Sequence, residues 1–489
     1  MTTAARADEQ LERGAIGLTE VLFQSITHMA PAVAVALSIG AATSFAGGNT
    51  PLAVVFALVA ALLTAYSLGE LARHLPSAGG MYTYVSNGLG SFAGWLMAWA
   101  FLLAEPIVPP ALFASFGLYG SIMLASVGIE GDIAWIIGAL VCAAIVWFLT
   151  FRGVTYSTRA GVVLGLIEIG IFLLIPLLLV INAGDRNTAS VFLPGSDGVL
   201  PALTGMVFSL LAFVGFEAAA PLGEEARNPK RTIRQAVLLS AVLVGLFYTF
   251  NYYAATVFFG PERMAGEFYT FNNGDPWGAM AEQVLPGIGG FLVIFAILNS
   301  SVANANSGAT ASTRAIFALG RSRILPAALG KVHPTYRTPA NAVHLQAIVG
   351  VVLVLVLGLA FANDDYGGPL AAYVFIGYAL GLLFAGMYIA LNVATIGYYL
   401  TTRRDEFNPI KHIVVPVLGV IALIPAFLGV LGGLTIPILN VTLDPLREPF
   451  SYVPPLVGIW MVIGIVLYFV LRARDAAAMD RIGEAVTEG

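Results

Sequence analysis

The amino-acid sequence predicts an all-α polytopic membrane protein that crosses the bilayer twelve times. Of its 489 residues, 58% are hydrophobic and 10% are charged, whereas soluble proteins carry about 25% charged residues. Apolar runs of about 18 or more residues, each long enough to cross a bilayer as a helix, recur along the chain. We expect the spans at about residues 18–44, 52–73, 92–122, 133–151, 160–182, 202–223, 234–259, 288–318, 342–361, 369–398, 412–432 and 455–472.

The first predicted span carries an interruption near its middle. Pro31 lacks a backbone N–H, so a carbonyl group one turn earlier loses its helical partner. Unpaired backbone is tolerated at membrane depth only where it faces protein or a water-filled cavity. We therefore assign this break to a candidate substrate site, and a satisfied core position is the alternative interpretation of His28. The break consists of Thr27, His28, Met29, Ala30, Pro31 and Ala32.

The sixth predicted span is broken in the same way between residues 212 and 221. Gly215 loosens the helix, and Pro221 cannot donate to the residue one turn back. The acidic residue Glu217 lies between them. We interpret the segment as a broken helix that lines a substrate site, with a kinked structural helix as the alternative. Its candidate substrate-binding residues are Ala212, Phe213, Gly215 and Phe216.

Breaks at equivalent places in two halves of a membrane protein indicate a transporter built from inverted repeats. The two interrupted spans are five helices apart, and an odd number of helices per repeat forces the second copy to insert upside down. We therefore expect a 5+5 transport core at residues 18–400, with repeats at about 18–182 and 202–398. Two accessory helices within residues 401–473 follow the core.

The placement of Lys and Arg predicts the orientation in the membrane. Twenty of the 23 basic residues fall in the two tails and in alternate loops, all on one side. Arg186, Arg263 and Arg447 are the other three. Because cytoplasmic loops carry the excess of basic residues, we expect cytoplasmic tails at residues 1–17 and 474–489 and a multi-pass protein of the cell membrane.

Three acidic residues fall inside predicted spans: Glu105, Glu168 and Glu217. A charge at the bilayer centre costs about 2.5–3.5 kcal/mol on insertion scales, so such acids are usually functional or paired. Too few Lys or Arg residues lie within the spans to pair all three, and burial favours the protonated carboxyl form. We expect Glu168 and Glu217 to carry protons and Glu105 to meet a substrate ammonium. A hydrogen bond to a neighbouring helix is the alternative for Glu105 and Glu168.

The eighth predicted span carries several small polar residues. Asn304 and Ser307 lie three residues apart, which places them on one helix face. They form a candidate ion site. The alternative is structural, because small polar side chains let membrane helices pack closely.

Three segments, in order along the chain, resemble signatures of the amino acid–polyamine–organocation permeases. Residues 66–84 contain Y-x-x-x-E and then P-S-A-G-G-x-Y-x-Y, with Glu70 expected to form a structural clamp with an arginine. Residues 213–231 contain F-V-G-F-E and then E-E-A-R-N-P-K-R. Residues 314–326 contain an arginine followed by R-S-R-I-L-P.

The resemblance implies a leucine-transporter-like fold and secondary active transport of amino acids or related organic amines between the first and sixth helices. Proton-coupled uptake is expected; the alternatives are substrate exchange and a polyamine or ethanolamine-type amine permease. Two positions depart from the family pattern. Thr27 to Pro31 stand where many members have a Gly-Ser-Gly run, and Glu168 stands where several proton-coupled members have a lysine.

Other classes of function lack their sequence signatures. The spans contain no H-E-x-x-H or G-x-S-x-G motif of an enzyme, and the chain has no G-x-x-x-x-G-K-[ST] loop of a pump. We expect no cofactor and no metal site, and a proton, or alternatively sodium, as the coupling ion. The expected partners are a small amino acid or amine and the lipid bilayer, with no nucleic acid; the sequence leaves the oligomeric state open.

Overall fold

The computed structural model describes residues 11–125, 128–129, 131–196, 198–321, 323–432, 434–436, 441–443, 446–474, 476 and 479. Within this part of the chain, twelve helical stretches are long and apolar enough to cross a membrane, which confirms the predicted number. They are Leu18–Ser38, Gly40–Ala72, Ser91–Ala125, Asp132–Phe151, Val154–Arg186, Leu200–Glu224, Pro229–Phe259, Gly289–Arg321, Ala340–Ala360, Gly368–Thr401, Ile410–Leu431 and Phe450–Arg474.

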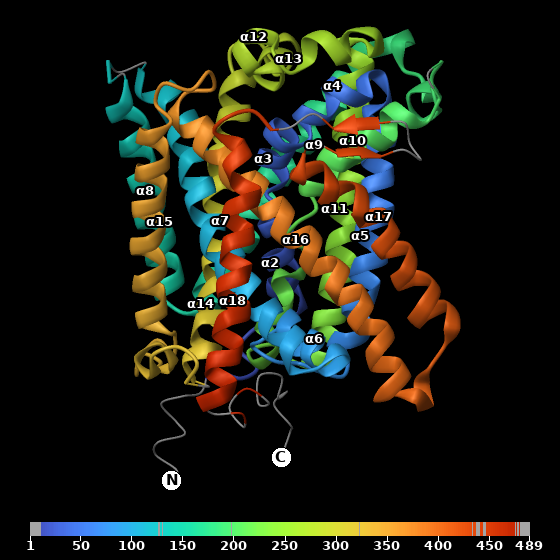
Figure 1. Ribbon diagram of the computed structural model, residues 1–489. Helices are drawn as coiled ribbons and strands as arrows, with labels where there is room; N and C mark the ends of the chain where they lie inside the picture. The colour runs from blue at the N-terminus through green and yellow to red at the C-terminus, as the bar shows by residue number, and fades with distance from the viewer. Residues whose placement is uncertain are drawn as a thin grey trace.

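Helices from both halves of the chain meet in the middle of the bundle (Figure 1). The first helix, α2 (Leu18–His28), contacts α9 (Val154–Ala183), α11 (Pro229–Phe259) and α14 (Gly289–Arg321). In turn, α14 packs against α7 (Ser91–Ala125). The interrupted first helix is therefore surrounded by protein, as its unpaired backbone requires.

Polar side chains on α14 make close contacts between the central helices. The Asn306 amide donates to the Ser157 carbonyl at 3.1 Å and accepts from the Ser157 hydroxyl at 2.8 Å. The Ser301 hydroxyl donates to that of Ser115 at 3.2 Å. Small polar residues therefore hold α14 against α9 and α7, as they commonly do between membrane helices.

The remaining long helices surround this centre and carry apolar side chains on their outer faces. On the last of them, Ile459 and Phe469 are 59% and 61% exposed. A water-facing surface would not collect such residues, whereas a lipid-facing surface does. These outer helices are α5 (Thr50–Ala72), α8 (Asp132–Phe151), α15 (Ala340–Ala360), α16 (Gly368–Thr401), α17 (Val415–Leu431) and α18 (Val453–Arg474).

The two ends of the bundle differ (Figure 1). The short helix α6 (Met81–Leu89) lies across one end, near the last turn of α18. The opposite end carries α12 (Phe271–Gly274) and α13 (Pro276–Val284). It also carries a small antiparallel hairpin, in which Leu434 pairs with Leu443. We call the first end the terminal end and the second the distal end.

The first span ends earlier than the sequence predicted. It ends at Ser38 rather than near residue 44. Short turns then follow, and at Gly47 the backbone adopts φ 53, a conformation that glycine accepts without steric cost. The next long helix, α5, begins at Thr50. Apolarity alone continues through residues 39–46, so hydropathy could not locate this boundary.

Candidate functional site

The first helix break consists of a left-handed residue followed by proline. Helix α2 ends at His28, Ala30 has φ 46, and Pro31 begins α3 (Pro31–Val33). The amide of Ala30 donates to the carbonyl of Thr27 at 3.0 Å, which closes the last turn of α2. Positive φ is uncommon for residues with a Cβ. Such a conformation persists only where the surrounding structure holds it.

The second break separates α10 (Leu200–Leu211) from a 3-10 helix over Phe216–Glu224, which we call η6. Gly215 has φ 126, a conformation that residues with a Cβ rarely adopt. A Cβ atom added at Gly215 would lie 2.7 Å from the backbone carbon of His28. Position 215 therefore requires glycine for two reasons: its positive φ, and the close contact between the two breaks.

Several hydrogen bonds join the two breaks. The hydroxyl of Ser25 donates to the carbonyl of Phe216 at 2.7 Å and accepts from the amide of Ala219 at 3.2 Å. The hydroxyl of Tyr248 on α11 lies 2.7 Å from the carbonyl oxygen of Met29 and 3.0 Å from that of Ala212. The two interrupted helices therefore form one connected unit in the middle of the bundle.

Carboxylates of the chain itself bind backbone amides at both breaks. Glu168 Oε2 accepts from the amide of Ala32 at 3.1 Å, at the start of α3. Glu217 Oε2 accepts from the amide of Gly215 at 3.0 Å and from the Tyr388 hydroxyl at 2.5 Å. Helix N-termini attract negative charge because their first amides lack helical partners. Each acid therefore occupies an anion-binding position that a broken helix creates.

A group of three buried polar side chains lies at the breaks. His28 is 2%, Glu105 0% and Glu217 1% exposed, and His28 Nε2 lies 3.7 Å from Glu105 Oε2. Neither carboxylate oxygen of Glu105 and neither ring nitrogen of His28 has a hydrogen-bond partner among the described residues. One ligand atom from each of the three residues lies within 4.8 Å of the others, a spacing that a metal ion or another cation would fit.

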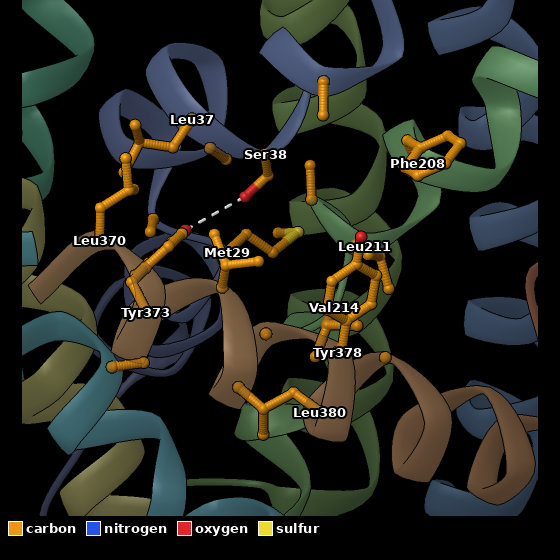
Figure 2. Close-up of a pocket in the computed structure, with 18 of the residues that line it drawn as sticks. Met29, Leu37, Ser38, Phe208, Leu211, Val214, Leu370, Tyr373, Tyr378 and Leu380 are labelled. Atoms are coloured by element: carbon orange, nitrogen blue, oxygen red, sulfur yellow. Dashed lines mark hydrogen bonds between the residues drawn. The ribbon is translucent and has the colours of Figure 1, made fainter. Parts of the chain in front are cut away.

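A cavity of about 710 Å³ adjoins this group at His28, whereas Glu105 and Glu217 are not among the residues that line it. His28, Met29 and Asn304 are at its inner end, and Phe45 and Tyr366 line its part near the distal end. Figure 2 shows its wall, to which Phe208 comes from α10 and Tyr373 and Tyr378 come from α16. Tyr373 is 3.2 Å from the Ser38 hydroxyl. The lining is mostly apolar and aromatic, as in typical small-molecule sites.

The terminal end is closed by arginine–glutamate pairs. Arg314 donates from Nε and Nη2 to the two carboxylate oxygens of Glu225, at 3.1 and 3.2 Å, and both side chains are 1% exposed. Arg321 contacts Glu224 at 2.8 and 3.0 Å. Ile16 pairs with Ala226 in a short parallel bridge. The cavity extends towards the distal end, where its lining residues Phe45 and Tyr366 are 47% and 41% exposed, and the ion pairs close the terminal end.

A third arginine–glutamate pair at this end confirms the cationic partner expected for Glu70. Its Oε1 accepts from Arg234 on α11 at 2.8 Å, and its Oε2 lies 3.7 Å from Arg73. The pair joins the end of α5 to the start of α11.

The structure brings most of the predicted site residues together, but only some of them line the cavity. His28, Met29, Ala30, Ala212 and Asn304 line the cavity. Thr27 bonds to the carbonyl of Phe23, and Pro31, Ala32 and Gly215 form the breaks without lining it. Phe213 packs edge-on against Tyr248, and Phe216 stacks on Tyr388. The functional roles of all these residues remain predictions.

The candidate ion site on α14 is engaged with the first helix. The Ser307 hydroxyl donates to the carbonyl of Gln24 at 2.6 Å, and the Asn304 amide donates to the carbonyl of His28 at 2.7 Å. Both residues therefore support the backbone of α2 just before its break. The Asn304 side-chain oxygen is buried and has no partner among the described residues.

Sequence reasoning did not identify the aromatic residues around the site. Tyr248 and Tyr388 bond to the breaks, and Tyr373 and Tyr378 line the cavity. A buried tyrosine hydroxyl needs a hydrogen-bond partner, so a tyrosine in the middle of a membrane span weakly indicates a polar site nearby. The chain has 18 tyrosines, so this signal alone did not select these four.

Comparison with known proteins agrees with this architecture. The family model for amino acid permeases matches residues 16–467. The low-affinity putrescine importer PlaP of Escherichia coli (strain K12) is 27% identical over 380 residues, covering 74% of this chain and 79% of that protein. The branched-chain amino acid permease BcaP of Lactococcus lactis subsp. cremoris (strain MG1363) is 26% identical over 457 residues, 88% of each chain.

The serine/threonine exchanger SteT of Bacillus subtilis (strain 168) is 26% identical over 319 residues, covering 63% of this chain and 69% of that protein. All three relatives are membrane transporters by name, and none is an enzyme. With twelve membrane-spanning helices and a family match over most of its length, this chain is a multi-pass membrane transporter that belongs to the amino acid permease family.

Proposed function

We propose that this protein imports amino acids or related organic amines across the cell membrane by alternating access, driven by proton entry. One observation carries the proposal. The two broken helices meet at the inner end of a cavity that extends to exposed residues near the distal end, and a buried ion pair closes the terminal end. Transporters that alternate between two such states bind their substrate where broken helices meet near the membrane midplane.

The names of the relatives support this class of substrate, and they include both an importer and an exchanger. They include a putrescine importer, a branched-chain amino acid permease and a serine/threonine exchanger. Exchange is therefore the alternative mode. Buried acids support proton coupling: Glu168 at the first break and Glu217 at the second are completely enclosed, and neither faces a Lys or Arg among the described contacts.

Transport by purified protein in proteoliposomes tests the proposal. A panel of radiolabelled amino acids and amines is offered under an imposed pH gradient, with the interior alkaline, and again under counterflow without a gradient. We expect saturable counterflow and accumulation that requires the gradient. Counterflow without gradient-driven accumulation would favour the exchanger, and flux that neither saturates nor shows counterflow would favour a channel.

The orientation is tested separately. We expect the terminal end in the cytoplasm, because most basic residues lie in the tails and in alternate loops. Arg231→Cys and Arg263→Cys are made in a Cys142→Ala background, which removes the only natural cysteine. An impermeant thiol reagent added to intact cells should label position 263 and leave 231 unlabelled until the membrane is opened. Labelling of both positions in intact cells would contradict the orientation.

A further inference from the structure

Resting on the proposed transport function, we propose that the substrate is a protonated amine that carries no carboxylate next to its ammonium group. The site offers acceptors for an ammonium, while the backbone amides that would bind a substrate carboxylate are already used by side chains of the protein. Four observations support this assignment.

The first observation is the state of the backbone amides at the start of the second half of the broken first helix. Pro31 has no N–H, Ala32 donates to Glu168 at 3.1 Å, and Val33 donates to the Ser300 hydroxyl at 3.4 Å. The next amide, that of Ala34, bonds within the helix to the carbonyl of Ala30 at 2.7 Å. Half-helix N-termini bind anionic substrate groups in transporters of this architecture. Here every amide of the first turn is already accounted for.

At the second break, two backbone amides are occupied by side chains of the protein. Its flexible residue, Gly215, donates its amide to Glu217 at 3.0 Å. Ala219, further into η6, donates to the Ser25 hydroxyl at 3.2 Å. A substrate carboxylate that approached Ala32 or Gly215 would have to displace a carboxylate of the protein and would meet its negative charge. Like charges in a buried site repel strongly because the surroundings screen them weakly.

The third observation is the kind of polar atom that is left unpaired. Asn304, which lines the inner end of the cavity, has a side-chain oxygen without a partner among the described residues, and so do Glu105 and Glu217, which adjoin His28 there. These atoms are acceptors when the acids are ionised. If His28 holds its proton on Nε2, the nitrogen that faces Glu105, then Nδ1 is an acceptor as well. An ammonium group offers three donors and a positive charge, and it therefore complements these acceptor atoms.

The fourth observation concerns the cavity lining. None of the described residues that line it is Lys, Arg, Asp or Glu. A carboxylate on the substrate would therefore find no counter-charge there. The wall is instead built by aliphatic side chains and by aromatic rings such as Phe208, Tyr373 and Tyr378. An alkyl or aryl group attached to the ammonium suits these surfaces, and aromatic faces also attract a cation.

The cavity favours an organic cation over a metal ion. Its volume of about 710 Å³ is far larger than a bare ion requires, and its walls are mainly apolar. One of the three potential metal ligands, Glu217, already accepts two hydrogen bonds through one oxygen. A metal ion therefore suits this site less well than an ammonium does, and the thermal-shift measurement below distinguishes the two.

Matched pairs of amine and amino acid test the inference. Phenethylamine is compared with phenylalanine, isoamylamine with leucine, and putrescine with ornithine, so that the members of each pair differ by one carboxylate. Binding to purified full-length protein is measured by calorimetry, and exchange is measured by counterflow in proteoliposomes. For at least one pair we expect the amine to bind about tenfold or more tightly than its amino acid, and to exchange.

The outcomes separate this inference from the transport proposal. If amino acids bind and exchange as well as or better than their amines, the inference is overturned while the proposed transport stands. If no member of any pair exchanges, both fail. If Zn²⁺ or Mn²⁺ raises the melting temperature and no amine does so, the buried group takes a metal ion and the inference is wrong.

A variant tests the role assigned to Glu168. Glu168→Ala frees the amide of Ala32, so it should bring the affinities for amine and amino acid at least about threefold closer together. The same substitution at exposed Glu262, which does not line the cavity, is the matched control and should leave the ratio unchanged. A ratio in Glu168→Ala equal to that of the natural protein would contradict the assigned role. If Glu168→Ala elutes as an aggregate, the inference is tested by the ratio of amine affinity to amino acid affinity in the natural protein.

Discussion

Two groups of buried carboxylates lie at different depths of this protein, and only one of them has cationic partners. At the terminal end, Glu225 binds Arg314 through two hydrogen bonds, and both side chains are 1% exposed. Beside the inner end of the cavity, Glu105 is 0% exposed and has no hydrogen-bond partner among the described residues. The same residue type is therefore satisfied within the fold in one place and left unsatisfied in the other.

This difference indicates a structural role for the paired carboxylates and a functional role for the unpaired ones. A buried ion pair is strongly destabilised when one partner is removed, because the other remains as an unpaired charge. A buried acid without a partner has no such contribution to lose, and it must stay protonated or receive a cation. We therefore expect the pairs at the terminal end to hold the protein closed there, and the acids beside the inner end of the cavity to bind a substrate or protons.

The largest effect is expected at the buried pair. Arg314→Met leaves Glu225 without its cation and should lower the free energy of unfolding by about 3–5 kcal/mol. The measurement is chemical unfolding of the purified protein in detergent. The double variant Arg314→Met/Glu225→Leu should recover most of the loss, because neither charge remains. Equal stability of the single and double variants would show that the ion pair is not the cause.

The opposite behaviour is expected at Glu105. Glu105→Gln removes a charge that no described residue compensates, so unfolding should be no easier than in the natural protein. Its affinity for an amine should fall about tenfold, since hydrogen bonds to charged groups contribute about 1.5–3 kcal/mol. Calorimetry and unfolding of the same preparation check both parts. A destabilised variant with unchanged amine affinity would assign Glu105 to the structural group.

A third substitution addresses coupling. Glu168→Gln keeps an oxygen that can accept from the amide of Ala32 but cannot release a proton. Uptake driven by a gradient of one pH unit should lose its roughly tenfold accumulation, equivalent to about 1.4 kcal/mol, while counterflow survives. Accumulation that persists in this variant would exclude Glu168 as the proton carrier, and that role would pass to Glu217 or Glu105.

The smallest effect is expected at an exposed ion pair. Arg263 contacts Glu267 at 2.6 Å, but both side chains are about half exposed, at 50% and 53%. Arg263→Ala should change the free energy of unfolding by about 0.5 kcal/mol or less, because water screens such pairs. It is the control for Arg314→Met in the unfolding series. A loss as large as that of Arg314→Met would mean that burial does not explain the difference.

The sequence by itself determined the parts of this protein that depend on local chemistry. Long apolar runs require membrane helices, because a lipid environment leaves no other partner for the backbone. Pro31 and Gly215 located the two breaks, since one lacks an N–H and the other accepts φ 126. The motif residues were sufficient to indicate the permease family, and the family match confirms that resemblance.

Only the tertiary structure decided which buried acids are paired. Glu217 and Glu225 are eight positions apart in the sequence, yet one bonds to Tyr388 and the other to Arg314, residues on two different distant helices. Likewise, Glu168 meets the amide of Ala32 across 136 positions of the chain. Periodicity and composition describe each helix alone, whereas these contacts depend on how the helices cross. The charge that remains unpaired, and therefore the site offered to a substrate, follows from that packing.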